Sequence, residues 1–170
     1  TYNRLMTARA SEPPPFGDEG YASSFASAKV AVLPVPYEAT VSYGKGTRRG
    51  PEAILRASTQ VELYDERTGS EPYRAGIWTD GPLDPELDGP SDRVARQVER
   101  RVGQLMDAGK SVVMLGGEHS ITPGAVAAAA ALKTALKTAT MHARGRTDNM
   151  NWSDRLADVA ISIKQLTPPR

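Results

Sequence analysis

The sequence predicts an α/β domain in which helices cover a parallel β-sheet. Two short, continuously apolar runs, 29–35 and 111–115, are rich in β-branched residues and bounded by Pro or Gly, as strands buried on both faces are. Between them, residues 91–108 carry apolar side chains at the three-to-four spacing of one helix face. A strand, a helix and a second strand in this order predict a β-α-β unit with both strands parallel in one sheet.

Length and composition are those of a globular protein. The 170 residues are sufficient for one compact domain with a hydrophobic core. The 21 basic and 20 acidic residues leave a net charge of +1, which gives no electrostatic reason to bind nucleic acid or an anionic membrane. We find no 18-residue apolar run and no secretory leader. With no cysteine, thiolate chemistry is excluded and a cytoplasmic location is expected.

Residues 1–28 are expected to form an N-terminal arm, followed by one domain over 29–170. The run Pro13-Pro14-Pro15 cannot lie inside a helix, and no sustained hydrophobic period follows it before the first strand. Two interpretations of the arm stay open: surface coil, or a segment that packs on a neighbouring subunit.

Local signals place a short helix after the first strand. Pro51 suits a first helical turn, which predicts a helix over 52–58. Ile54 and Leu55 are expected to turn toward the core, with Val61 joining them just beyond the helix end.

Later in the chain, a short strand is expected at 75–78 and a long helix at 91–108. Ser91 is expected to cap this helix with its side chain, and Gly109 to end it. An alanine-rich helix is expected over 124–139. The apolar stripe of the long helix consists of Val94, Val98, Val102 and Leu105.

The loop at 37–51 is rich in glycine and carries Lys45, Arg48 and Arg49. Such a loop can cradle phosphate, but the pattern Gly-x4-Gly-Lys-Ser/Thr is absent. Phosphate binding and an ordinary strand-to-helix connection therefore both stay open, as does nucleotide binding at this loop or at the later glycine pair.

Asp80, Asp84 and Asp88 lie in a connection rich in Gly and Pro. The Asp-x-Asp-x-Asp-Gly spacing of a calcium loop is absent. Ordinary turn chemistry is therefore the interpretation that we favour.

The second apolar strand leads into Gly116-Gly117-Glu118-His119-Ser120-Ile121. The two glycines allow a sharp turn. His119 is then expected at the carboxyl end of a central parallel strand, where open α/β sheets bind their ligands. Taken alone, a single histidine more often has a structural role than a functional one.

The string Gly-Gly-Glu-His-Ser-Ile after an apolar strand resembles the first metal-ligand motif of the ureohydrolases, the family of arginases and agmatinases. Residues 33–65 are similar to the N-terminal region of bacterial and archaeal agmatinases. The resemblance implies a three-layer α/β/α arginase-like fold with a parallel sheet, incomplete at the C-terminus, and a loop at 37–51 that shapes the rim of the active-site cleft. The matching strings are Pro36-Tyr37-Glu38, Ser42-Tyr43-Gly44-Lys45-Gly46, Arg49-Gly50-Pro51 and Val61-Glu62-Leu63-Tyr64-Asp65.

The same resemblance implies a site and a reaction. His119 becomes a ligand of one of two Mn²⁺ ions, with Glu118 beside it among the residues that orient the ligands. The implied reaction is the hydrolysis of agmatine to putrescine and urea, in which the two ions supply a hydroxide from water. Family members are homo-oligomers, so the implied partners are a guanidino substrate and further copies of the chain.

The second ligand motif of the family, Asp-x-His-x-Asp at a strand end, has its best counterpart at residues 140–144. His142 is the second candidate metal ligand, and an exposed or packed histidine is the alternative. Thr140 and Arg144 stand where the family has aspartates. Threonine cannot neutralise a dication as a carboxylate does, and arginine would repel it.

The C-terminal residues match the family less well. Asp154, after Trp152-Ser153, stands where the family has a histidine that assists proton transfer. Residues 159–168 are similar to a family strand and its exit, and the chain stops before the last aspartate motif. Four of the six usual ligands therefore have no counterpart. Asp148, Asp154 and Asp158 are the only aspartates after His119. Asp154 and Asp158 could share a helix face, but surface solvation is the interpretation that we favour.

We therefore expect an agmatinase-type ureohydrolase by family, in a truncated or diverged form that binds one metal ion weakly or none and has little activity. The alternative is a non-catalytic ureohydrolase-like remnant with a structural or interaction role. A strand at 159–163, if formed, would lie at a sheet edge and favour association.

Overall fold

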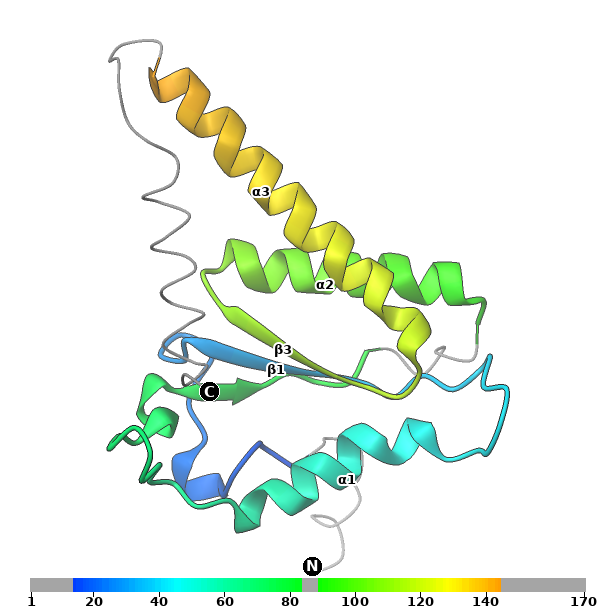
Figure 1. Cartoon of the computed structure of the whole chain (residues 1–170), viewed down its shortest axis with the longest axis vertical. Helices are drawn as coiled ribbons and strands as arrows, with labels where there is room; N and C mark the ends of the chain where they lie inside the picture. The colour runs from blue at the N-terminus through cyan, green and yellow to red at the C-terminus, as the bar shows by residue number, and fades with distance from the viewer. Residues whose placement is uncertain (1–13, 84–88, 145–170) are drawn as a thin grey trace, which may run out of the picture.

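A small parallel sheet lies between helices in the computed structural model, which describes residues 14–83 and 89–144. Helix α1 covers one face of the sheet, and α2 and α3 cover the other (Figure 1). The strands are β1 (Val30–Val35), β2 (Ile77–Thr79) and β3 (Ser111–Gly116), in the order β2-β1-β3. The α-helices are α1 (Gly50–Ala57), α2 (Ser91–Asp107) and α3 (Thr122–Arg144). Short 3₁₀ turns lie at Glu19–Tyr21, Thr47–Arg49, Ser58–Gln60, Pro72–Ala75 and His119–Ile121.

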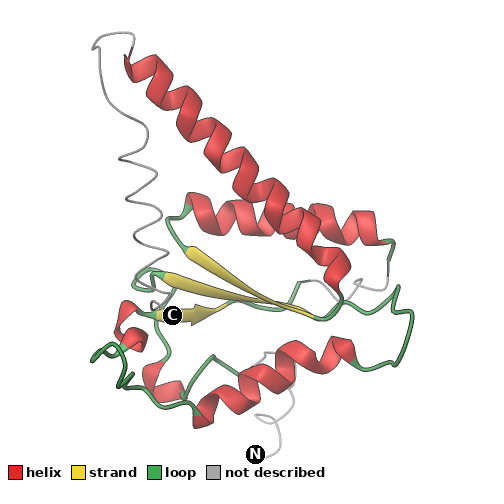
Figure 2. Ribbon diagram, viewed as in Figure 1, coloured by secondary structure: helices red, strands yellow, loops and turns green. Residues whose placement is uncertain are grey.

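This architecture confirms the predicted α/β fold with a parallel sheet and helices on both faces (Figure 2). Both β1–β2 and β1–β3 pairs are parallel, with Val30 opposite Ile77 on one side and Ser111 on the other. The predicted strands at 29–35 and 111–115 are present, and the short strand expected at 75–78 starts two residues later and ends one residue later, as β2.

The expectation that residues 111–115 form the central, fully buried strand is wrong for the described residues. The central strand is β1, which is buried from Ala31 to Val35. Strand β3 lies at the edge of this three-stranded sheet, and its Val113 side chain is 47% exposed. A short apolar run indicates a strand, but it does not tell which strands flank it.

The core lies between the sheet and α2. The predicted stripe Val94, Val98, Val102 and Leu105 is buried, together with Leu33 and Val35 of β1. Helix α3 crosses α2 closely, since a Cβ on Gly124 would collide with the carbonyl oxygen of Ala95. Apolar periodicity therefore predicted this part of the core correctly.

Helix α1 buries fewer residues than expected. Leu55 is fully buried, whereas Ile54 is 45% exposed and Val61 is 56% exposed. Consecutive residues of a helix point about 100° apart, so a short helix with one face on the sheet buries only one of an adjacent pair. The predicted core positions at Ile54 and Val61 are wrong.

The helix ends also differ from the predictions. Ser91 is the first residue of α2 and Pro90 is its N-cap, without a side-chain hydrogen bond, so the predicted serine cap is wrong. Gly109 follows the helix with φ +76, as predicted for a glycine that ends it. Helix α3 starts at Thr122 and runs to Arg144, beyond the predicted end at residue 139.

The described part of the arm, residues 14–28, packs against the domain. The Phe16 amide donates to Thr79 Oγ1 at 2.8 Å, and the Gly17 amide donates to Ser58 Oγ at 2.8 Å. Ala22 forms an isolated parallel bridge to Ile77. Residues 1–13 lie outside the described residues. Within the described parts of the chain, we find no helix with the length and hydropathy needed to cross a membrane.

Candidate functional site

Two loops meet at the carboxyl edge of the sheet, one after β1 and one after β3. The ladder between these strands continues past their ends, because the Gly117 amide donates to the Val35 carbonyl at 3.1 Å. The Glu118 amide donates to the Tyr37 carbonyl at 3.0 Å. Tyr37 is fully buried, and its hydroxyl donates to the Gly89 carbonyl at 3.1 Å. The edge predicted to bind ligand is therefore a tightly joined pair of strand exits.

The glycines of the predicted motif are required for close packing as well as for turning. A Cβ on Gly117 would collide with the carbonyl oxygen of Tyr37 and would lie 3.2 Å from that of Thr47. A Cβ on Gly50, at the start of α1, would lie 3.4 Å from the Gly116 carbonyl oxygen. The loop after β1 therefore passes directly over the exit of β3.

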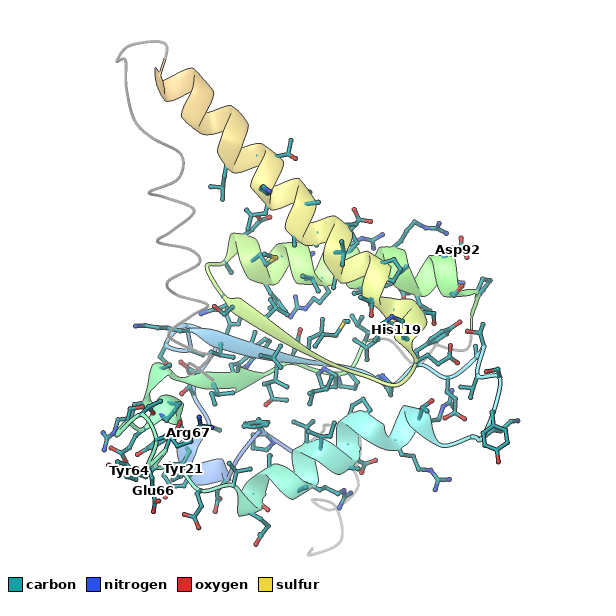
Figure 3. All side chains as sticks on the ribbon, viewed as in Figure 1. Tyr21, Tyr64, Glu66, Arg67, Asp92 and His119 are labelled. Atoms are coloured by element: carbon teal, nitrogen blue, oxygen red, sulfur yellow. The ribbon has the colours of Figure 1, made fainter. Side chains whose placement is uncertain are left out.

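His119 opens the 3₁₀ turn His119–Ile121 that links β3 to α3. Figure 3 shows it where the chain leaves β3 and enters α3. Ile121 is buried and anchors this turn, whereas His119 is exposed and its imidazole makes no hydrogen bond within the described residues. The predicted position of His119 at the carboxyl end of a parallel strand is confirmed, while its role as a metal ligand stays a prediction.

The Glu118 side chain reaches across to the loop after β1. Its Oε1 accepts a hydrogen bond from the Thr40 amide at 2.6 Å, and its Oε2 accepts from Thr40 Oγ1 at 2.5 Å. Ser120 Oγ donates to Oε2 at 3.0 Å. Burial raises the pKa of Glu118, but the hydrogen bonds from Thr40, Ser120 and the Val41 amide outweigh burial and hold the pKa below its usual 4.5. The carboxylate thus bonds to Thr40 and Ser120, and no hydrogen bond to the His119 imidazole is present.

A second carboxylate closes the same loop on itself. Glu38 accepts hydrogen bonds from the Gly46 amide at 2.8 and 2.9 Å and from the Arg48 amide at 2.8 Å. The Arg48 amide, followed by that of Gly46, holds the pKa of Glu38 below its usual 4.5. Gly44 and Gly46 have φ of 68° and 124°, a backbone that favours glycine. We call residues 38–48 the rim loop.

The rim loop borders a hollow of about 410 Å³ lined by Glu38, Gly46 and three basic side chains, Lys45, Arg48 and Arg49. A phosphate cradle would need free backbone amides facing this hollow. The amides of Gly46 and Arg48 instead donate hydrogen bonds to the Glu38 carboxylate, so this geometry does not favour phosphate binding.

The remaining candidate metal ligands are not brought to this edge within the described residues. His142 lies in the last turn of α3, on helix rather than on a strand end, and its side chain is outside the described part. Asp148, Asp154 and Asp158 lie beyond the described residues. Among the side chains that the structure describes, which exclude those of 137–144, no three His, Asp or Glu residues are placed to hold a metal ion. One histidine does not make the binuclear site that the resemblance implies, so the described donor set does not fit it.

Sequence reasoning missed Thr40, which binds both oxygens of Glu118. The two residues are 78 positions apart, and a lone threonine in a loop carries no signal of such a contact. It also missed the partner of Asp80, which pairs with Arg101 of α2 through two hydrogen bonds at 2.5 and 2.8 Å. Asp84 lies outside the described residues, as does Asp88.

Comparison with known proteins places these features in a family. The model of the Arginase family matches residues 28–140. The chain is 44% identical over 124 residues to an N(1)-aminopropylagmatine ureohydrolase of Synechocystis, covering 69% of this chain and 40% of that enzyme. It is 33% identical over 99 residues to an agmatinase of Bacillus anthracis, covering 58% of this chain and 34% of the relative.

A solved structure agrees with these matches. The agmatine ureohydrolase of Thermoplasma volcanium superimposes with a TM-score of 0.58 at 32% identity, covering 64% of this chain and 36% of that one. The chain thus spans about 40% or less of the length of these relatives. The matched residues include both strand exits, the rim loop and His119. Because the family model covers well over half of its residues, the chain belongs to the arginase family.

Proposed function

We propose that the protein is a ureohydrolase, an enzyme that releases urea from a guanidino compound. The observation that carries this proposal is the placement of His119 at the carboxyl end of β3, next to Glu118, which bonds to the rim loop, in a chain of the arginase family. Open α/β sheets bind ligands at this edge.

Agmatine is the substrate that we propose first, with N(1)-aminopropylagmatine beside it. The relatives compared above are named for these two compounds. Both pair a guanidino head with an amine tail, so the head would lie at the metal site and the tail toward the rim. The activities for which the relatives are named support the substrate class without separating its two members.

Manganese is the metal that we propose, in a cytoplasmic homo-oligomer. His119 supplies an imidazole nitrogen, which suits Mn²⁺ together with carboxylate oxygens. His142 and further carboxylates would have to complete the site from residues outside the described part. Glu118 is not proposed as a ligand, because both of its oxygens are engaged with Thr40 and Ser120.

A non-catalytic role is the second candidate, and a specific observation favours it. Thr140 and Arg144, which stand where the family has aspartates, lie in α3 and not at a strand end. A chain that keeps the fold and the rim but lacks the carboxylates would not hold two metal ions.

Urea release decides between the two. The complete protein, purified after Mn²⁺ loading, is incubated separately with agmatine and with N(1)-aminopropylagmatine, and urea and the amine product are measured together. Stoichiometric formation of urea and putrescine, or urea and spermidine, supports the enzyme. No urea from either substrate, in a protein with native secondary structure by circular dichroism, contradicts it and supports the non-catalytic role.

A further inference from the structure

The rim loop is held by two carboxylates that act from different sides. Glu38 belongs to the loop and fastens its C-terminal part through the amides of Gly46 and Arg48. Glu118 belongs to the exit of β3 and fastens the N-terminal part through Thr40. The two residues together leave the middle of the loop projecting, and Tyr43 in it is 95% exposed.

Of these two attachments, only the Glu118–Thr40 contact joins the rim loop to another segment, the exit of β3. Both carboxylate oxygens take part, one with the amide and one with the hydroxyl of the same residue. Hydrogen bonds to a charged acceptor are stronger than neutral ones. This pairing therefore fixes where the loop begins relative to the His119 turn, which follows Glu118 directly.

We propose that Glu118 is a positioning residue that locks the rim loop onto the exit of β3 and thereby keeps the substrate-binding rim in the shape seen here. That the rim binds substrate rests on the proposed function, whereas the lock itself rests on the contacts with Thr40. A loop that is ordered before binding does not have to be ordered by the ligand. Loss of the lock then weakens substrate binding and leaves the reacting groups in place.

The competing role for Glu118 is the orientation of His119 as a metal ligand. Residues that orient ligands cost about 10- to 100-fold in metal affinity when they are replaced. The two roles differ in their dependence on Thr40, because Thr40 contacts Glu118 and makes no hydrogen bond to His119 within the described residues.

The test compares Glu118→Gln, Thr40→Val and the double variant in the complete protein. Thr59→Val is the matched control, since it removes a threonine hydroxyl that bonds to the Arg56 carbonyl outside the rim loop. The rate of trypsin cleavage under native conditions measures how firmly the rim loop is held, without any need for enzyme activity of the protein. Trypsin can cut after Lys45, Arg48 or Arg49, which lie in or beside the loop. Circular dichroism melting confirms that each variant is folded.

The lock predicts faster tryptic cleavage at these sites in both single variants, by about 3- to 30-fold, the range expected for loss of one charge-assisted hydrogen bond at a partly exposed site. The double variant is expected to be cut no faster than the faster single variant, because both changes weaken the same contact between Glu118 and Thr40. Unchanged cleavage in folded single variants would overturn the proposal, whether or not the protein releases urea.

Kinetics and metal content give the second readout. If the protein is an active ureohydrolase, both variants are expected to raise KM by a similar factor with kcat and Mn²⁺ content unchanged, while the control variant matches the wild type. A loss of Mn²⁺ in Glu118→Gln that Thr40→Val does not share would overturn the lock and assign Glu118 to the metal. Absence of urea release in the wild type would contradict the proposed function alone, because cleavage still reports the lock.

Discussion

At the scale of single residues, the close packing at the carboxyl edge of the sheet requires a residue without a side chain. Gly117 lies so close to the Tyr37 carbonyl that any side chain would force the two strand exits apart. The sequence indicated this glycine as a turn residue. Its second requirement, close approach to a segment 80 positions earlier, is a tertiary property that no local pattern contains.

Replacement of Gly117 by alanine is therefore expected to destabilise the protein by about 2–4 kcal/mol, because the backbone of Tyr37 cannot move without breaking the strand exit. The control is Gly103→Ala in α2, where a Cβ meets nothing within 4 Å. This control is expected to stabilise by about 0.5–1 kcal/mol through helix propensity. Urea unfolding measures both, and equal effects of the two substitutions would contradict the account.

The charge of Glu38 gives a prediction about pH. Its pKa in the folded protein lies below the usual 4.5, so its contribution to stability is complete above pH 4.5 and is lost as the pH falls through the lower folded value. As the pH falls through the folded-state pKa of Glu38, we expect the hydrogen-exchange rates of the Gly46 and Arg48 amides to rise relative to their intrinsic rates. Glu38→Gln should show the faster exchange already at neutral pH.

The control for the pH prediction is Glu62→Gln, an exposed carboxylate outside the rim loop. It is expected to leave the exchange of both amides unchanged. Amide exchange at Gly46 and Arg48 that is independent of Glu38 would show that other contacts hold this part of the loop.

At the scale of elements, local patterns predicted what each segment is, and tertiary contacts decided where it lies. The α2 stripe follows from helical periodicity, and strands β1 and β3 follow from short apolar runs rich in β-branched residues. The edge position of β3, the exposure of Ile54 and the absence of a Ser91 cap do not, because each depends on which neighbour packs there. The ion pair between Asp80 and Arg101 is a further such contact, since it joins the exit of β2 to α2.

That ion pair is expected to contribute to stability. The Asp80 side chain is only 9% exposed and that of Arg101 is 33% exposed, and the two form a bidentate pair. Arg101→Ala leaves a nearly buried carboxylate without this partner, at a cost of about 1–3 kcal/mol. The matched control is Arg56→Ala, which breaks an exposed pair with Glu52 in α1 and is expected to cost less than about 0.5 kcal/mol.

Thermal or urea unfolding distinguishes the two arginine variants. If Arg56→Ala lowers the free energy of unfolding as much as Arg101→Ala does, burial does not determine how much these ion pairs stabilise the protein. A cost near zero for both would mean that the Asp80 carboxylate is solvated once its partner is removed.

At the scale of the whole molecule, the described residues supply only part of the candidate site at the sheet edge that carries His119. The rim loop, the glycine pair and the His119 turn are in place, as the resemblance implied. No three His, Asp or Glu side chains of the described residues are placed to hold a metal ion, and residues 140–144, the counterpart of the second family motif, lie in α3. The position of His119 could therefore be predicted from sequence, whereas the contact with Thr40 and the helical position of His142 could not.

The most direct test of this account is the Mn²⁺ content of the complete protein, measured by inductively coupled plasma mass spectrometry after dialysis against dilute Mn²⁺, for the wild type and for His119→Ala. The account predicts bound Mn²⁺ in the wild type and the loss of at least one ion per chain in the variant, with the fold unchanged by circular dichroism. Equal Mn²⁺ content in the two proteins would contradict the assignment of His119 as a metal ligand.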